Sequence, residues 1–221
     1  EDYLVIYDKK GTQIYIMTSQ GLVSNIETTM TIEQVSIAAQ GTVAVLMGDQ
    51  SNSYLVVYDK SGKELVNGAI YGEDGGYPIA IALSNDAIKL AVSMLDINDG
   101  NVKTTIAFYN FGSVGENEID RIVSANSFSD MVIPQLDFVS DDRMVAYGDS
   151  EIAIFEGTQK PKLTQEIPLT GEAKSIFNNN KYVGVVYSNN DEKLTHHVAV
   201  YDMPGFTVME KDFSQEYTEI G

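Results

Sequence analysis

One motif recurs along the sequence at a nearly constant spacing: a short apolar segment that ends in an aromatic residue followed by an acid or an amide. Its four copies are residues 55–59, 106–110, 152–156 and 198–202. Their aromatic residues, Tyr58, Tyr109, Phe155 and Tyr201, lie 51, 46 and 46 residues apart. A period of roughly 20 to 50 residues indicates structural units that stack on one another, so this motif constrains the fold more than any other feature.

Each copy belongs to a unit of four short apolar segments separated by polar turns. Two segments precede the motif, and one follows it after a glycine. The preceding segments are 35–38 and 43–47, 79–83 and 88–94, 136–139 and 144–147, and 175–177 and 182–187; the glycines are Gly62, Gly112, Gly157 and Gly205. Short apolar segments bounded by Gly, Asn, Asp and Ser are typical of antiparallel strands joined by tight turns. The sequence therefore predicts four strands in each unit.

Four antiparallel strands repeated at this period are typical of a β-propeller blade. The predicted fold is an all-β propeller of about five blades in a single domain, 1–221, with blades at approximately 1–30, 31–72, 73–130, 131–170 and 171–212. A β-sandwich would rarely repeat one four-strand pattern so regularly, and βαβ units would need amphipathic helices between the strands. The alternative is that the chain forms part of a larger propeller of seven or eight blades.

The first and third units depart from the pattern. Residues 1–30 hold three predicted strands and lack the innermost one, with Met17 at the position of Tyr58. Either the segment Asp212–Gly221 supplies that strand and closes a five-bladed ring, or further blades lie outside this sequence. Within the third unit, Asn117–Met131 shows some helical spacing. Because part of this segment is an outer strand in the repeat register, we interpret it as an expanded loop or edge.

The repeated motif also carries a family resemblance. The Tyr58-Asp59 and Tyr201-Asp202 strand ends, with the turns at 83–86 and 139–142, resemble the blades of WD-repeat and quinoprotein-type propellers across nearly the whole chain. The Trp-Asp and Gly-His signatures of true WD repeats are missing, and the sequence has no tryptophan. A weaker similarity is to an uncharacterised family of membrane-anchored, extracytoplasmic propellers of Gram-positive bacteria. That resemblance implies an exported location and no established activity.

Composition narrows the classes of partner and the cellular location. The 221 residues include 14 basic and 32 acidic side chains, a net charge of −18, so nucleic acid is an unfavourable partner. There is no cysteine, which excludes disulfides and thiolate metal sites and fits an exported bacterial protein. The sequence lacks an initiator Met and has no apolar run long enough to cross a bilayer. We expect an extracytoplasmic protein tethered to the cell surface by a segment absent from this sequence.

No residues form an evident catalytic set. The two histidines, His196 and His197, are adjacent, so on a strand they point to opposite faces and cannot share one metal ion. We expect no metal and no cofactor. The many carboxylates leave a glycosidase-type site open, and Asp137 is its best candidate, because it lies in a predicted innermost strand among apolar neighbours. The simpler interpretation is that Asp137 faces a water-filled channel or accepts hydrogen bonds from backbone groups.

Two loops that carry acidic residues are candidate ligand sites. The loop 71–78 offers Tyr71, Asp74 and Tyr77 on a glycine-rich backbone, a pattern seen in recognition loops, although packing between blades would also explain the tyrosines. The segment 96–101 resembles a calcium loop, but its glycine falls one place early and no glutamate follows at the twelfth position. We interpret it as a hairpin turn.

The sequence thus favours a non-enzymatic binding module with an unknown protein or carbohydrate partner. Its candidate ligand-binding residues are Asp137, Tyr71, Asp74 and Tyr77. The repeated aromatic residues are expected to pack between blades, and the acids and amides that follow them are expected to open turns. The alternative function is a carbohydrate-active hydrolase that uses carboxylates at the channel mouth.

Overall fold

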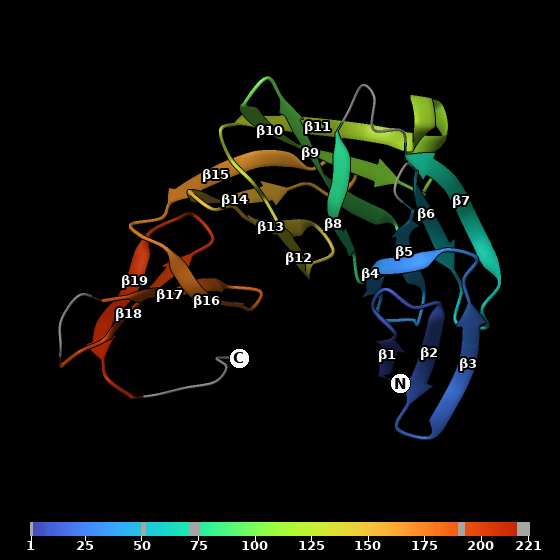
Figure 1. The fold of residues 1–221 in the computed structure, drawn as a ribbon, viewed down its shortest axis with the longest axis horizontal. Coiled ribbons are helices and arrows are strands. Elements are labelled where there is room, and N and C mark those ends of the chain that lie inside the picture. Colours follow the sequence, from blue (N-terminus) through green and yellow to red (C-terminus); the bar gives the residue numbers. More distant parts are fainter. Residues whose placement is uncertain (1, 50–51, 71–75, 190–192, 216–221) are drawn as a thin grey trace.

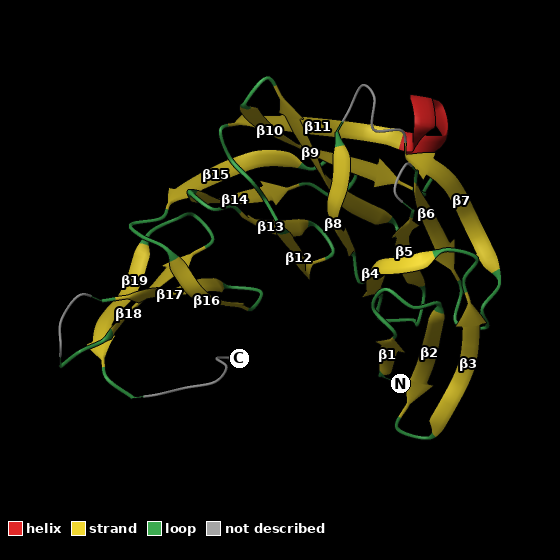
Figure 2. Cartoon of the chain, in the orientation of Figure 1, coloured by secondary structure: helices red, strands yellow, loops and turns green. Residues whose placement is uncertain are grey.

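The structure, a computed structural model, describes residues 2–49, 52–70, 76–189 and 193–215. It is all-β and confirms the predicted fold: five antiparallel sheets, the blades, follow one another along an arc (Figures 1 and 2). In each sheet the strands are adjacent in chain order. Since consecutive antiparallel strands need short turns, this topology follows from the polar turns seen in the sequence.

The strands are, blade by blade, as follows. Blade 1 has β1 (Tyr3–Tyr7), β2 (Gln13–Thr18) and β3 (Gly21–Glu27); blade 2 has β4 (Thr31–Ile37), β5 (Val43–Gly48), β6 (Ser53–Tyr58) and β7 (Glu64–Ile70); blade 3 has β8 (Tyr77–Leu83), β9 (Lys89–Asn98), β10 (Asn101–Asn110) and β11 (Ile122–Ser129); blade 4 has β12 (Gln135–Ser140), β13 (Arg143–Tyr147), β14 (Glu151–Glu156) and β15 (Lys162–Pro168); blade 5 has β16 (Ala173–Asn178), β17 (Tyr182–Ser188), β18 (His196–Asp202) and β19 (Thr207–Phe213).

The first strand of each complete blade lies on the concave side of the arc. β4 contacts β8, and β8 contacts β12, so these innermost strands stand side by side (Figure 1). Blade 1 has three strands among the described residues, and its β1 contacts β4. The predicted lack of an innermost strand in blade 1 is therefore confirmed for the described part of the chain.

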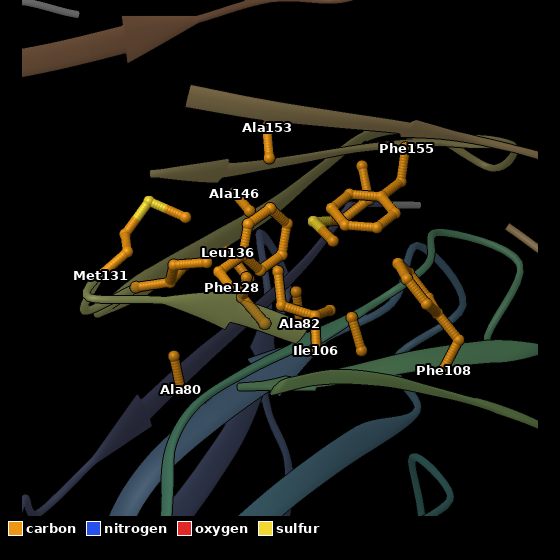
Figure 3. Close-up of a cluster of buried hydrophobic side chains, with 13 residues drawn as sticks. Ala80, Ala82, Ile106, Phe108, Phe128, Met131, Leu136, Ala146, Ala153 and Phe155 are labelled. Atoms are coloured by element: carbon orange, nitrogen blue, oxygen red, sulfur yellow. The ribbon is translucent and has the colours of Figure 1, made fainter. Parts of the chain in front are cut away.

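The apolar core is divided into four clusters, each between two neighbouring blades. Tyr58 lies in the cluster of blades 1 and 2, Tyr109 packs against that of blades 2 and 3, and Phe155 and Tyr201 lie in the next two. In the cluster of blades 3 and 4, the ring centroids of Phe108 and Phe155 are 5.1 Å apart at 54° (Figure 3). This tilted contact is a favourable aromatic geometry. The prediction that the repeated aromatic residues fill the space between blades is confirmed.

The residues after these aromatics hold the turns. The Asp59 carboxylate accepts hydrogen bonds from the Ser61 and Lys63 backbone N–H groups at 2.8 and 3.0 Å. Asn110 accepts from the Gly112 N–H, and Asp202 accepts from the Phe206 N–H. These three positions behave as predicted. The fourth, Glu156, instead pairs with Arg143 across the neighbouring strand at 2.7 Å, because its longer side chain reaches a cation there.

The segment with helical spacing contains no α-helix. It begins with two 3-10 turns, η1 (Gly115–Asn117) and η2 (Ile119–Arg121), and continues as the outer strand β11. Asp120 and Arg121 have positive φ angles of 53° and 62°, a region that non-glycine residues rarely adopt. The interpretation as an expanded loop leading into an edge strand is therefore confirmed.

For the start of the segment Asp212–Gly221, one of the two expected sources of ring closure, the structure differs from the expectation. Asp212 and Phe213, the first residues of that segment, belong to β19, the outermost strand of blade 5. They pair with His197 and His196 of β18. Residues 216–221 lie outside the described residues. In Figure 1, blades 1 and 5 lie at the two ends of the arc.

Candidate functional site

Two hollows open on the same side of the arc, where the innermost strands begin; we call this side the top face. The first hollow has a volume of about 470 Å³ and lies over blades 1 to 3, with Pro134 of blade 4 at its border. The second has a volume of about 310 Å³ and lies between blades 4 and 5. Pro134 lines both. The top face thus offers adjoining concave surfaces, the usual form of a binding site.

The first hollow combines aromatic, proline and charged side chains. Tyr77 and Pro78, at the start of β8, line it together with Tyr7 and Lys9 of blade 1. The Tyr77 side chain is 64% exposed although it carries a large apolar ring. Exposed aromatic rings beside prolines and charges are typical of surfaces that bind polypeptides.

Gln34, which lines the first hollow, is held in place by hydrogen bonds between its side chain and the backbone of β8. The Gln34 carboxamide accepts a hydrogen bond from the Ile81 N–H at 2.8 Å and donates one to the Ile81 carbonyl at 3.2 Å. One residue pair along, the Ser36 hydroxyl accepts from the Leu83 N–H at 2.9 Å. β8 is an edge strand of its sheet, so the backbone groups on its free edge have no partner strand. Side chains of β4 supply hydrogen bonds to these groups instead. At the rim, Glu33 forms an ion pair with Lys10.

The second hollow is mainly apolar and has a buried tyrosine in its wall. Tyr147 is 4% exposed, and among the described residues its hydroxyl makes no hydrogen bond of good geometry. Burial, and secondarily the negative charge of Asp137, raise the pKa of the Tyr147 hydroxyl well above its usual value. This tyrosine therefore stays protonated at neutral pH, and its O–H can act as a donor.

Asp137 bridges blades 4 and 5 rather than lining a hollow. Its carboxylate accepts hydrogen bonds from the Gln135 amide at 2.9 Å and from the Asn178 amide at 3.1 Å. The side chain is half-buried. The groups that hold Asp137 are side-chain amides, whereas our simpler interpretation had named backbone groups as the possible donors. These two donors hold the Asp137 side chain in place between blades 4 and 5.

The two predicted ligand-binding residues that the structure describes lie at different places. Tyr77 lies in the wall of the first hollow, and Asp137 lies at the contact of blades 4 and 5. Tyr71 and Asp74 lie outside the described residues. Sequence reasoning missed Gln34, Pro134 and Tyr147. The available signal was positional: Gln34 and Pro134 stand at the starts of innermost strands, where propeller loops gather.

The remaining candidates are accounted for by local structure. The 96–101 segment is a hairpin turn, as predicted, in which Asn98 pairs with Asn101, and Asp99 and Gly100 have positive φ angles. The ring of His196 stacks on Phe213, and the His197 Nδ1 lies 2.7 Å from an oxygen of Asp212. Across the described ranges, no group of three or more His, Asp or Glu side chains is placed to hold a metal ion.

The helices of the described residues are 3-10 turns of three residues, and none is long and apolar enough to span a bilayer. No curated protein matches the chain.

Solved structures match the fold at low sequence identity. A eukaryotic initiation factor aligns with 99% of this chain at 12% identity and a TM-score of 0.61, and the chain spans 56% of that protein's length. The WD40 domain of Neurospora crassa Pan2 aligns with 96% of the chain, which spans 63% of that domain, at 12% identity and a TM-score of 0.55. A protein of unknown function from Bacteroides caccae aligns with 95% of the chain and 72% of its own length, at 14% identity and a TM-score of 0.53.

These similarities concern the propeller fold and support the expected likeness to WD-repeat blades. The whole sequence, residues 1–221, matches one family model, and the chain therefore belongs to the family of unknown function DUF5711.

Proposed function

We propose that this propeller is a binding module that recognises a polypeptide segment in the first hollow of its top face. One observation carries the proposal: Tyr77, which is 64% exposed, lines a concave surface together with Pro78, Tyr7 and Lys9. A rigid aromatic side chain offers a large contact area at a small entropy cost. Hydrogen bonding to Ile81 holds Gln34, which lines this hollow, in place.

Charge and fold agree with this proposal. The net charge of −18 favours partners with basic residues, and the acidic Glu33 and Asp49 line the same hollow. The aligned WD40 domain and the other propellers support the fold, on which loops at one face commonly serve binding.

A peptide selection tests the proposal. A phage-displayed library of random 12-residue peptides would be selected on the immobilised chain, and the affinities of the enriched peptides would be measured by fluorescence polarisation. We expect Tyr77→Ala to weaken binding about tenfold or more, as for a central aromatic contact. Phe206→Ala is the matched control, because Phe206 is 70% exposed but lies in the turn before β19, away from the top face.

Equal affinities for the wild type and Tyr77→Ala would contradict the proposed site. Binding of the chain to a glycan array, together with failure to enrich any peptide, would contradict the class of partner and favour a carbohydrate.

The extracytoplasmic location is likewise a proposal, supported by the absence of cysteine and by the resemblance to exported propellers. Added protease should degrade the protein on intact cells. Degradation seen only after lysis would contradict this location. The Asp137 carboxylate accepts hydrogen bonds from the side-chain amides of Gln135 and Asn178, and these contacts do not favour the hydrolase alternative.

A further inference from the structure

Blade 1 turns an apolar face away from the rest of the molecule. Leu4 and Ile6 of β1 pair with Met17 and Tyr15 of β2, so these four side chains lie on one side of the sheet. Leu4 is 58% exposed, and Ile6 and Tyr15 are also exposed. The opposite side of the same strands, with Ile14 and Ile16, is fully buried against blade 2. Blade 1 therefore has two apolar faces, of which blade 2 covers one.

At the other end of the arc, the outer face of blade 5 is apolar as well, but its central side chains are already covered within this chain: Val186 is fully buried and Val200 is 9% exposed. Val183 and Val185 pack in the cluster with blade 4, so their neighbours Gly184 and Val186 face the other way. Val200 pairs with Gly184 and with Met209, and Val198 pairs with Val186, which adds apolar side chains to that outer face. The ring of Phe177 fills the space above Gly184, where an added Cβ would lie 2.0 Å from the ring. Met209 is exposed.

The register of the repeat indicates what such faces contact. The positions of Leu4, Ile6, Tyr15 and Met17 in blade 1 correspond to Val43, Val45, Val56 and Tyr58 in blade 2, since each set pairs in the same register. In blade 2 these residues lie in the cluster shared with the preceding blade.

The blade 5 positions correspond in the same way to the following side of blade 2. Gly184, Val186, Val198 and Val200 take the register positions of Ala44, Leu46, Leu55 and Val57. Those residues of blade 2 pack against blade 3. By the register that orders the described blades, the outer face of blade 1 therefore takes the position that contacts the preceding blade in blade 2, and that of blade 5 takes the position that contacts the following blade.

We propose that the exposed outer face of blade 1 is covered by a further four-stranded blade of the same polypeptide. Two observations favour this occupant. The face continues the pattern of the established contacts between blades, and the chain spans 56% and 63% of two aligned propellers. A second copy is less favourable, because it would bring together two chains that each carry a charge of −18.

Hydroxyl-radical footprinting tests the proposal. The 221-residue chain would be compared with the polypeptide encoded by its natural gene, and the mass of each would be measured by light scattering. We expect Tyr15 and Met17 to be oxidised in the 221-residue chain and to react about tenfold more slowly in a monomer of the natural polypeptide. Tyr77 is the internal control, because its exposed ring should react equally in both.

A pair of variants gives a second test that needs the natural polypeptide alone. Leu4→Lys and Leu65→Lys place the same charge at sites that are 58% and 54% exposed in the described structure. If a blade covers Leu4, the first variant buries a charge and should lower the melting temperature by about 5 °C or more, whereas the second should change it little.

Three results would overturn the proposal: equal oxidation of Tyr15 in both proteins, equal effects of the two lysine variants, or protection that requires a dimer. A natural polypeptide with no sequence beyond these 221 residues would overturn it as well.

Discussion

At the scale of single residues, one lysine stands out because it is buried as a charge. The Lys89 side chain is 1% exposed, donates to the Thr158 carbonyl at 2.9 Å and lies 3.7 Å from a carboxylate oxygen of Asp86. Lys89 is on blade 3 and Thr158 is in the last turn of blade 4, so this contact joins two blades. A buried charge persists where partners compensate the loss of water.

Removal of the Asp86 carboxylate should therefore destabilise the protein. We expect Asp86→Asn to lower the free energy of unfolding by about 1–3 kcal/mol at pH 7, because the buried Lys89 side chain loses the carboxylate beside it. Denaturation in urea measures this change. Asp96→Asn, which removes the same charge from an exposed position, is the control and should be nearly neutral. Equal midpoints for the two variants would contradict the role of Asp86.

The effect of Asp86 should also depend on pH. Burial works against its charge, but hydrogen bonds from the Ser84 hydroxyl and the Ile88 N–H, with the charge of Lys89, outweigh burial and lower the pKa of Asp86. A lowered folded-state pKa contributes stability that is present above the unfolded value of about 3.9 and is lost as the pH falls through the folded value. The difference between wild type and Asp86→Asn should thus shrink below pH about 4. A difference that stays constant down to pH 2 would disprove this origin.

For Glu151, the effect of the side-chain charge on folding stability should have the opposite sign. Burial, and then the charge of Glu166 on the neighbouring strand, raise the pKa of Glu151. The ionised form is therefore less favourable in the folded state, and this cost is present above the folded pKa and absent below the unfolded value of about 4.3. Glu151→Gln should raise the melting temperature at pH 7 and have no effect below pH about 4. A lower melting temperature at pH 7 would show that Glu151 stabilises the fold.

At the scale of elements, the Gln34 side chain makes two of the hydrogen bonds that join β4 and β8. Gln34→Ala would leave both backbone groups of Ile81 without their hydrogen bonds. We expect a loss of about 1–3 kcal/mol in the free energy of unfolding, and Gln34→Glu should retain part of it, because a carboxylate can still accept from the N–H. Gln20→Ala, in an exposed turn, is the control for chemical denaturation. An unchanged stability of Gln34→Ala would contradict this contact.

The elements themselves could be predicted because their signals are local. Asp99-Gly100 marks a hairpin turn, and Asp59 and Asp202 open turns through bonds to residues a few positions away. The segment 117–131 was harder. Its apolar spacing is compatible with a helix, but pairing of β11 with β10 determines the outcome, and that pairing depends on a strand distant in sequence.

At the scale of the whole molecule, the repeat predicted the blades but not the site. The first hollow requires Tyr7, Gln34, Tyr77 and Pro134 from four different blades, and no spacing in the sequence relates them. In the same way, Asp137 was singled out as a charge in an innermost strand. Its interpretation depends on Asn178, 41 residues away in another blade. Local patterns specify strands and turns, whereas concave surfaces arise from the packing of blades.

A crystal structure of this chain with a selected peptide would test the central claim most directly. The account predicts five antiparallel blades in an arc, Asp137 held by Gln135 and Asn178, and the peptide in the first hollow against Tyr77. A peptide bound at the outer edges of the blades, or a top face in which the first hollow is filled by side chains, would contradict it.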